Sequence, residues 1–196
     1  MSVLLIAGSP SDRSRTVALL EATGQRLEAR GVQVNQLRVR DLSPQALLLA
    51  DFGHPSISQA LGQVAQADVI IVATPVYKAA YSGVLKVFLD LLPQSGFKDK
   101  VVLPLATGGS PHHMLALDYS LRPVLQALGA KHILPGIYAT DAQVTLSESG
   151  SYQISADIGE RLDDAVHTLI TETVQTGLAI ATRFAPVAFS QVQYSS

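Results

Sequence analysis

Short apolar runs and stretches of helical periodicity alternate along this chain. Most of the apolar runs are rich in β-branched residues and bounded by glycine, proline or serine, which is typical of strands buried on both faces of a parallel sheet. Residues 32–37 alternate apolar and polar positions instead, which indicates a strand nearer to an edge. The pattern predicts five strands: Val3–Ala7, Val32–Leu37, Val69–Ala73, Val101–Ala106, and a broken fifth strand at His132–Leu134 with Ile137–Tyr138.

Helices are expected between these strands, because apolar residues there recur every three or four positions. Ser14 or an adjacent hydroxyl residue should cap the first helix, Gly31 should end it, and Gly129 is a suitable stop before the fifth strand. Asp41–Pro44 should open an irregular stretch, and Asp141–Ser155 should form a polar loop. The expected inner faces are Val17, Leu20, Gly24 and Leu27; Leu61 and Val64 within Ser56–Ala67; Leu85, Phe88, Leu89 and Leu92; Leu117, Leu121, Val124 and Leu128; and Leu162, Ala165, Val166, Leu169 and Thr173.

This order of elements predicts an α/β domain with a doubly wound parallel sheet, because each strand is followed by a helix that can serve as a crossover. We expect one domain over residues 1–177. Strand pairing should stop at Pro75, which has no N–H to donate. Residues 178–196 have no place in this sheet, and two interpretations stay open: an oligomer contact, or a surface arm or partly disordered terminus.

Composition narrows the classes of function. The chain has 196 residues, 47% hydrophobic and 15% charged, with a formal net charge of −2, so nothing favours nucleic acid or an anionic membrane as partner. It has no cysteine, which excludes disulfides, thiol nucleophiles and thiolate metal sites. The N-terminal apolar run is short and lacks a preceding basic region, so we expect no signal peptide and a cytoplasmic location.

The loop Gly8–Thr16 is the first candidate site. It follows a strand, opens a helix and contains four hydroxyl residues and two arginines. Backbone N–H groups at a helix N-terminus, hydroxyl donors and an arginine together suit a phosphate group, although an ordinary capped loop has a similar composition. The loop lacks the Gly-Lys-Ser/Thr ending of a P-loop and the Gly-x-Gly-x-x-Gly fingerprint, which argues against a P-loop NTPase and a Rossmann dehydrogenase.

Two further loops leave neighbouring strands at the same edge of the predicted sheet. Thr74–Gly83 and Thr107–Ser110 offer backbone amides, small residues and an aromatic, which suits a flat, partly polar ring. The sequence shows no catalytic triad and no His-Glu-x-x-His motif, and His112 and His113 are adjacent, which disfavours a shared metal. Phosphate donors beside a ring site, without acid–base residues, suggest that a cofactor carries the chemistry and that no metal is involved.

These three loops together resemble the NAD(P)H-dependent FMN reductases of flavodoxin-like fold, with strand order 2-1-3-4-5 and helices on both faces. The similarity runs from Val3 to about Leu169, and the alkanesulfonate FMN reductase type, the reductase partner of two-component sulfonate monooxygenases, is the nearest. The residues that carry the resemblance are Gly8-Ser9-Pro10, Ser14-Arg15-Thr16, Ala73-Thr74-Pro75-Val76-Tyr77-Lys78-Ala79-Ala80-Tyr81-Ser82-Gly83, and Pro104-Leu105-Ala106-Thr107-Gly108-Gly109.

The resemblance implies the cofactor-binding residues. The FMN phosphate would be held by Ser9, Ser14, Arg15 and Thr16; Pro75, Val76, Tyr77 and Lys78 would run beside the flavin; and Thr107, Gly108, Gly109 and Ser110 would follow the isoalloxazine edge. The wider family often has arginine where this chain has Ser11, so Arg13 or Arg15 must supply the charge.

The resemblance also implies a homo-oligomer, a tetramer or dimer. Members of the nearest type carry an extra residue in the helix after Thr-Gly-Gly, and Tyr119 falls there. An inserted residue would form a π-bulge, which often marks a functional site, whereas an ordinary half-buried tyrosine on a helix flank is the alternative.

The implied activity is the reduction of FMN to FMNH₂ by a reduced nicotinamide, and NADPH is the favoured donor. The FMNH₂ would be used by a partner monooxygenase that desulfonates sulfonates, which belongs to sulfur metabolism. The alternatives are a quinone or azo-dye reductase that retains its flavin, a non-enzymatic flavodoxin-like electron carrier, which is usually more acidic, and a plain phosphate-ligand binding module. The sequence does not decide between NADPH and NADH, between FMN as prosthetic group and FMN as substrate, or which arginine meets the phosphate.

Overall fold

A parallel sheet forms the centre of the computed structural model, which describes residues 1–183. Its strands lie in the order β2-β1-β3-β5, and two short strands, β6 and β7, both pair with β5 as the two pieces of the broken fifth strand. Counted as five parallel strands, the sheet has the order 2-1-3-4-5, so the expected fold class is confirmed. The strands are β1 Ser2–Ala7, β2 Gln33–Arg38, β3 Val69–Tyr77, β4 Ala80–Tyr81, β5 Val101–Gly108, β6 His132–Ile133, β7 Ile137–Thr140, β8 Val144–Leu146 and β9 Tyr152–Ile154.

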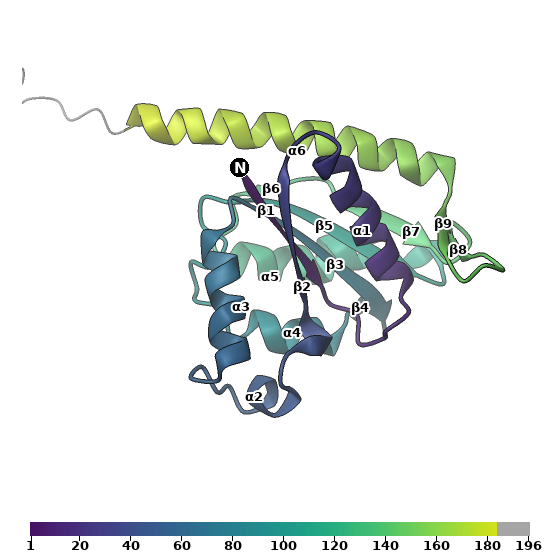
Figure 1. Cartoon of the computed structure of the whole chain (residues 1–196), viewed down its shortest axis with the longest axis horizontal. Helices are drawn as coiled ribbons and strands as arrows, with labels where there is room; N and C mark the ends of the chain where they lie inside the picture. The colour runs from purple at the N-terminus through teal and green to yellow at the C-terminus, as the bar shows by residue number, and fades with distance from the viewer. Residues whose placement is uncertain (184–196) are drawn as a thin grey trace, which may run out of the picture.

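Helices cover both faces of the sheet (Figure 1). Helices α1 and α6 lie against one face, and α3, α4 and α5 against the other. The split follows from the alternation of side chains along each strand: Leu4 and Ile6 belong to one core cluster, and Val3 and Leu5 to the other. The helices are α1 Arg15–Glu28, α2 Pro44–Leu48, α3 Pro55–Gln66, α4 Gly83–Leu89, α5 Arg122–Ala127 and α6 Ala156–Arg183, with 3₁₀ turns at Val39–Asp41 and Pro111–His113 and a π-helix at Leu117–Leu121.

The helix boundaries follow the local sequence. Ser14 has extended backbone and its hydroxyl accepts a hydrogen bond from Val17 N, 3.4 Å away, so the expected cap of α1 is confirmed. Gly31 (φ +77°) and Gly129 (φ +87°) adopt the left-handed conformation just after α1 and α5. Glycine takes this conformation without a Cβ clash, which explains why both helices stop where they do.

Two expectations about local structure need correction. The parallel pairing of β3 with β5 does end at Pro75, opposite Thr107, as expected. Strand β3 itself continues to Tyr77, however, because Val76 and Tyr77 pair with the short antiparallel strand β4. The segment Asp141–Ser155 is also not a plain loop, because it contains the hairpin of β8 and β9.

The stretch after β2 is irregular only in part, since it includes a 3₁₀ turn and the short helix α2, capped by Ser43. The expected boundary at residue 177 falls inside α6, whose backbone continues to Arg183. Most of the tail lies outside the described residues, so its role stays a prediction. Within residues 1–183, no helix combines the length and apolar composition that crossing a membrane requires.

Candidate functional site

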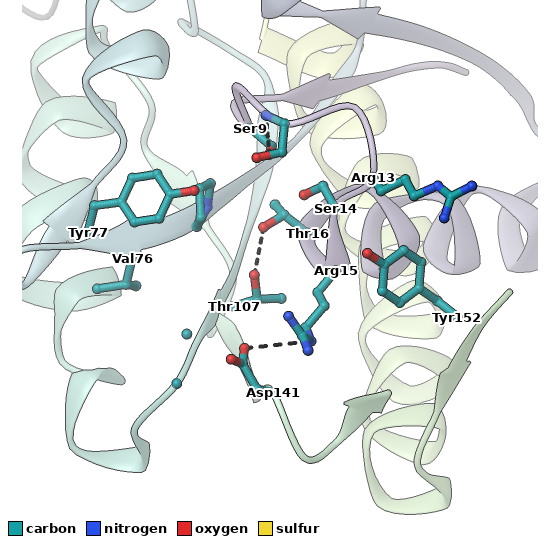
Figure 2. Close-up of a pocket in the computed structure, with 14 residues that line it drawn as sticks. Ser9, Arg13, Ser14, Arg15, Thr16, Val76, Tyr77, Thr107, Asp141 and Tyr152 are labelled. Atoms are coloured by element: carbon teal, nitrogen blue, oxygen red, sulfur yellow. Dashed lines mark hydrogen bonds and ion pairs between the residues drawn. The ribbon is translucent and has the colours of Figure 1, made fainter. Parts of the chain in front are cut away.

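Three loops at the carboxyl edge of the sheet enclose a cavity of about 210 Å³. They follow β1, β3 and β5, and the hairpin β8–β9 adds a fourth wall. This is the edge at which open α/β sheets bind their ligands. The lining residues are Ser9, Ser11, Arg13, Ser14, Arg15, Thr16, Pro75, Val76, Tyr77, Thr107, Gly108, Gly109, Asp141 and Tyr152 (Figure 2).

Ten of the twelve cofactor-binding residues expected from the sequence line this cavity. Lys78 and Ser110 do not: Lys78 lies in the exposed β3–β4 turn, and Ser110 caps the 3₁₀ turn that follows β5. Four lining residues were not among the twelve: Ser11, Arg13, Asp141 and Tyr152. Asp141 and Tyr152 were missed because they belong to a polar segment whose strands have only three residues each, too short for a period to be recognised.

The β1–α1 loop is held close to the neighbouring strand and helix. Gly8 N donates to the carbonyl of Ala73 at 2.8 Å, and a Cβ on Gly8 would lie 2.7 Å from the Cβ of Leu85. Glycine is therefore required at this position. The carbonyl of Gly8 accepts a hydrogen bond from the hydroxyl of Ser82, which also caps α4. The loop that begins the site is thus fixed to the loop after β3.

Hydroxyl groups gather at the N-terminus of α1. Ser9 is buried and its Oγ accepts from Ser11 N at 3.2 Å, while Thr16 is buried beside β5. The Oγ1 atoms of Thr16 and Thr107 lie 2.6 Å apart, and this hydrogen bond joins the first and third loops (Figure 2). Hydroxyls and free N–H groups at the start of a 14-residue helix form a cradle that fits a phosphate group.

The two arginines of this loop differ in their surroundings. Arg15 Nε donates to the carbonyl of Val144 at 2.9 Å and lies 3.8 Å from the carboxylate of Asp141. Within residues 1–183, Arg13 has no ion pair or side-chain hydrogen bond. In Figure 2, Arg13 and Tyr152 lie on the side of the cavity opposite Tyr77. The positive charge of Arg13 is therefore available to a ligand in the cavity. Arg15 also brings a positive charge, and its hydrogen bond to Val144 attaches the β8–β9 hairpin to the start of α1.

The loop after β3 is a tight hairpin. Lys78 and Ala79 both have positive φ, 50° and 63°, as a two-residue turn of this kind requires. Thr74 Oγ1 accepts from Ser82 N at 2.9 Å, which closes the base of the hairpin. Pro75 and Val76 thereby present backbone and apolar surface to the cavity, and Tyr77, at 49% exposure, stands at its mouth.

The loop after β5 is shaped by Tyr138. The hydroxyl of Tyr138 donates to the carbonyl of Ser110 at 2.6 Å. A Cβ on Gly108 would lie 2.5 Å from this hydroxyl oxygen of Tyr138. Burial raises the pKa of Tyr138, and the nearby carboxylate of Asp141 adds to the effect. The tyrosine therefore stays a neutral donor, and the absence of a Cβ at Gly108 leaves the space that its hydroxyl occupies.

The π-helix at Leu117–Leu121 has Tyr119 at its centre, and the side chain is 80% exposed. The geometry expected from an inserted residue is therefore present. The role of Tyr119 in an oligomer contact stays a prediction.

Comparison with known proteins places these features in a family. Residues 1–145 match the model of a family described as NADPH-dependent FMN reductase. An "FMN reductase (NADPH)" of Pseudomonas putida strain KT2440 is 48% identical over 189 residues, which cover 96% of this chain and 92% of the relative. The protein of the same description from Escherichia coli K12 is 47% identical over 168 residues, 86% of this chain and 87% of its own length.

A solved structure agrees with the sequence comparison. The apo form of NADH:FMN oxidoreductase (EMOB) superimposes with a TM-score of 0.78 at 41% identity, over 86% of this chain and 87% of that protein.

Proposed function

The chain belongs to the family of NADPH-dependent FMN reductases, and on this premise we propose how its cavity serves NAD(P)H-dependent reduction of FMN. The observation that carries the proposal is the continuity of one cavity from the hydroxyl-rich start of α1 to the backbone-lined ends of β3 and β5. One end suits a phosphate and the other a flat ring, which are the two ends of FMN.

The phosphate end is assigned to Ser9, Ser14, Arg15 and Thr16, with Arg13 as the additional cation. The helix dipole and the hydroxyl donors favour a dianion there. Pro75, Val76 and Tyr77 support the ring from one side, and Thr107, Gly108 and Gly109 follow its edge. Lys78 and Ser110 lie outside the cavity lining and serve as neighbours of the ring at most.

The bound flavin supplies the redox chemistry, because it accepts hydride from a reduced nicotinamide. The protein's own groups fix the position of the ring, leave one face open to the second nucleotide, and exclude water from the other face. Within the described residues Asp141 is the one carboxylate that lines the cavity, and it lies beside Arg15. Because the hydride passes directly from the nicotinamide to the flavin, the proposed reaction needs no side chain as an acid or base.

The finer part of the proposal is that reduced FMN leaves for a partner monooxygenase, as in sulfonate desulfonation. The cavity has an exposed mouth, at which Tyr77 stands, and this supports exchange of the flavin. A quinone or azo-dye reductase that retains its flavin is the second candidate, since the same cavity could accept an organic ring after the nicotinamide has left.

Anaerobic oxidation of NADPH and NADH by the purified apoprotein at increasing FMN tests this function. Saturation in FMN, with stoichiometric release of FMNH₂ through an ultrafiltration membrane, is expected. Oxidation confined to retained flavin, or dependent on an added quinone or azo dye, would favour the second candidate. Absence of oxidation with either nicotinamide would refute a reductase and leave a carrier or binding module.

A further inference from the structure

Four charged side chains form a network between the β1–α1 loop and the end of β2. Asp12 Oδ1 lies 3.2 Å from Arg38 Nη2 and 3.2 Å from Arg40 Nη1. The carboxylate of Asp41 lies 3.8 Å from Arg38 Nε and 3.7 Å from Arg40 Nε. The carboxylates are the more exposed members, at 80% and 60%, whereas both arginines are about 30% exposed. The guanidinium groups therefore form the inner part of the network.

Two donor atoms of this network have ion-pair partners but make no hydrogen bond. Arg38 Nε and Arg40 Nη1 are buried and make no hydrogen bond of acceptable geometry with the described residues, although carboxylates lie within ion-pair distance. Buried polar groups are normally hydrogen-bonded, so a buried donor without a hydrogen bond is available to an added acceptor. Two such donors on neighbouring guanidinium groups suit an anion that brings several acceptor oxygens.

An apolar groove of about 280 Å³ adjoins Arg40. Its walls come from the β1–α1 loop, the segment after β2, helix α2 and helix α4, and among residues 1–183 Arg40 is the one charged residue that lines it. Such a groove suits a flat, weakly polar ring whose anionic substituent reaches the arginine. The lining residues are Pro10, Val39, Arg40, Leu42, Pro44, Leu47, Leu48, Val84 and Val87.

The groove borders the flavin cavity. Pro10 lines the groove, while its neighbours Ser9 and Ser11 line the cavity, so the two spaces lie on opposite sides of one short stretch of loop. Adjacent Cα atoms are only about 3.8 Å apart. Figure 1 shows α2, α4 and β4 at the same end of the sheet. One extended ligand can therefore reach both spaces across the loop.

We propose that the groove, with Arg40 and Arg38, binds the adenosine 2′-phosphate half of NADPH. This rests on the proposed function, since it assigns the second nucleotide of the same reaction. The adenine lies in the apolar groove, the 2′-phosphate accepts from these two guanidinium donors, and the pyrophosphate crosses the loop towards the flavin. The 2′-phosphate displaces the exposed carboxylate of Asp12, and the network thereby selects NADPH over NADH.

Substitution of the arginines tests the phosphate contact. Arg40→Gln and Arg38→Gln should each lower the ratio of kcat/KM for NADPH to that for NADH at least tenfold, which is about 1.4 kcal/mol. Arg30→Gln is the matched control, because Arg30 pairs with Asp163 of α6 and touches neither space. An unchanged ratio, or a wild-type enzyme without preference for NADPH, would overturn the proposal.

Asp12→Asn separates the proposal from a purely structural network. Removal of the competing carboxylate should raise the NADPH-to-NADH ratio, because the 2′-phosphate no longer has to displace a like charge. A network that only braces the loop predicts the opposite pattern, namely weaker FMN binding with an unchanged ratio. That pattern would contradict the proposal.

The groove itself is tested with Val84→Phe, which narrows it. The ratio of kcat/KM for NADPH to that for reduced nicotinamide mononucleotide, which lacks the adenosine half, should fall about tenfold. An equal loss with both donors, or a changed elution volume on a sizing column with an unchanged ratio, would assign the groove to folding or to a second copy instead.

Calorimetric titration of adenosine 2′,5′-bisphosphate distinguishes failure of this inference from failure of the proposed function. Binding that Arg40→Gln weakens at least tenfold supports the site even if the protein oxidises no nicotinamide. Absence of binding, or binding that Arg40→Gln leaves unchanged, overturns the inference even if FMN reduction is confirmed.

Discussion

Arg13 and Arg15 carry the same charge at the same helix N-terminus but have different surroundings. Arg15 donates a hydrogen bond to the carbonyl of Val144 and forms an ion pair with Asp141, whereas Arg13 makes no such contact within residues 1–183. In the proposed function, Arg13 and Arg15 together supply the charge for which the resemblance implies an arginine in place of Ser11. At the scale of single residues, the proposed phosphate end of the cavity therefore depends on hydroxyls and on these two charges.

Removal of a hydroxyl and a charge from the cradle should weaken FMN binding. The double variant Ser9→Ala/Arg15→Ala should raise the FMN dissociation constant at least tenfold, about 1.4 kcal/mol, since both groups face the cavity. Fluorescence titration of FMN measures it. Ser149→Ala, at the exposed tip of the β8–β9 hairpin, is the control. Unchanged affinity in the double variant would remove this loop from the site.

Gly108→Ala should lower FMN affinity about tenfold, because its Cβ would lie 2.5 Å from Tyr138 Oη and push one of the two away. In Gly108→Ala/Tyr138→Phe the offending oxygen is gone, and the remaining neighbours at 3.4 Å make ordinary contacts. The second substitution should therefore restore most of the affinity. FMN titration of both variants is the measurement, and failure of the double variant to recover would contradict the steric explanation.

The pH dependence of stability should report the buried phenol of Tyr138. Its pKa is raised in the folded state, chiefly by burial, so its contribution is fully present below the ordinary tyrosine value of 10.0 and is lost as pH rises through the folded pKa. Urea unfolding above pH 10 should therefore show a steeper loss for the wild type than for Tyr138→Phe. The pKa of Tyr81 is also raised by burial. Because Tyr81 is present in both proteins, its contribution to the pH dependence cancels when the two unfolding free energies are compared.

At the scale of elements, the site depends on bonds between loops that are far apart in the sequence. The Thr16–Thr107 hydrogen bond joins the start of α1 to the end of β5, and Ser82 joins α4 to the loop after β1. Each bond sets the distance between two walls of the cavity. The β8–β9 hairpin is attached in the same way, through Arg15.

Loss of one threonine should cost more than loss of both. Thr107→Val keeps the shape but leaves the buried hydroxyl of Thr16 without its partner, which should cost about 1–3 kcal/mol of unfolding free energy. Thr16→Val/Thr107→Val should recover part of that loss, because no hydroxyl is then stranded. Chemical denaturation of the two single variants and the double variant gives the coupling, and strict additivity would show that the bond has no separate role.

At the scale of the whole molecule, helix α6 lies along one face of the sheet and continues beyond it, where Figure 1 shows no other element against its end. Its inner residues Ile158, Leu162, Val166 and Leu169 are fully buried, so the first part of the helix belongs to the core. The described contacts of α6 with the core extend as far as Leu169 and Ile170. The prediction that the tail is an oligomer contact therefore remains open.

Truncation tests the role of the tail. If it forms an oligomer contact, deletion of the residues after Gly177 should shift the elution volume on a sizing column towards a smaller species. A second truncation after Arg183, which keeps all of α6, serves as the control that separates the helix from the final 13 residues. Unchanged elution of both proteins would favour a surface arm.

The sequence by itself determined the five strands, the helices other than α2, and the three strand-end loops that form the cavity. These follow from local periodicity, capping and turn chemistry, which act between residues close together in the chain. The resemblance of the three loops to a family supplied the strand order and the flavin. Local rules failed where a strand was very short, as in β8 and β9, or where a proline did not end a strand, as in β3.

The tertiary structure alone decided which distant groups meet. It brought Asp141 and Tyr152 to the flavin cavity, joined Thr16 to Thr107, and placed Arg38 and Arg40 around Asp12. The sequence had offered no arginine cluster for a 2′-phosphate, because Arg38 and Arg40 stand two positions apart without any sign of a shared partner, and Asp12, which contacts both, lies more than twenty positions away on another loop. Only the twist and register of the sheet bring the ends of β1 and β2 together, and this contact depends on the whole core rather than on any local pattern.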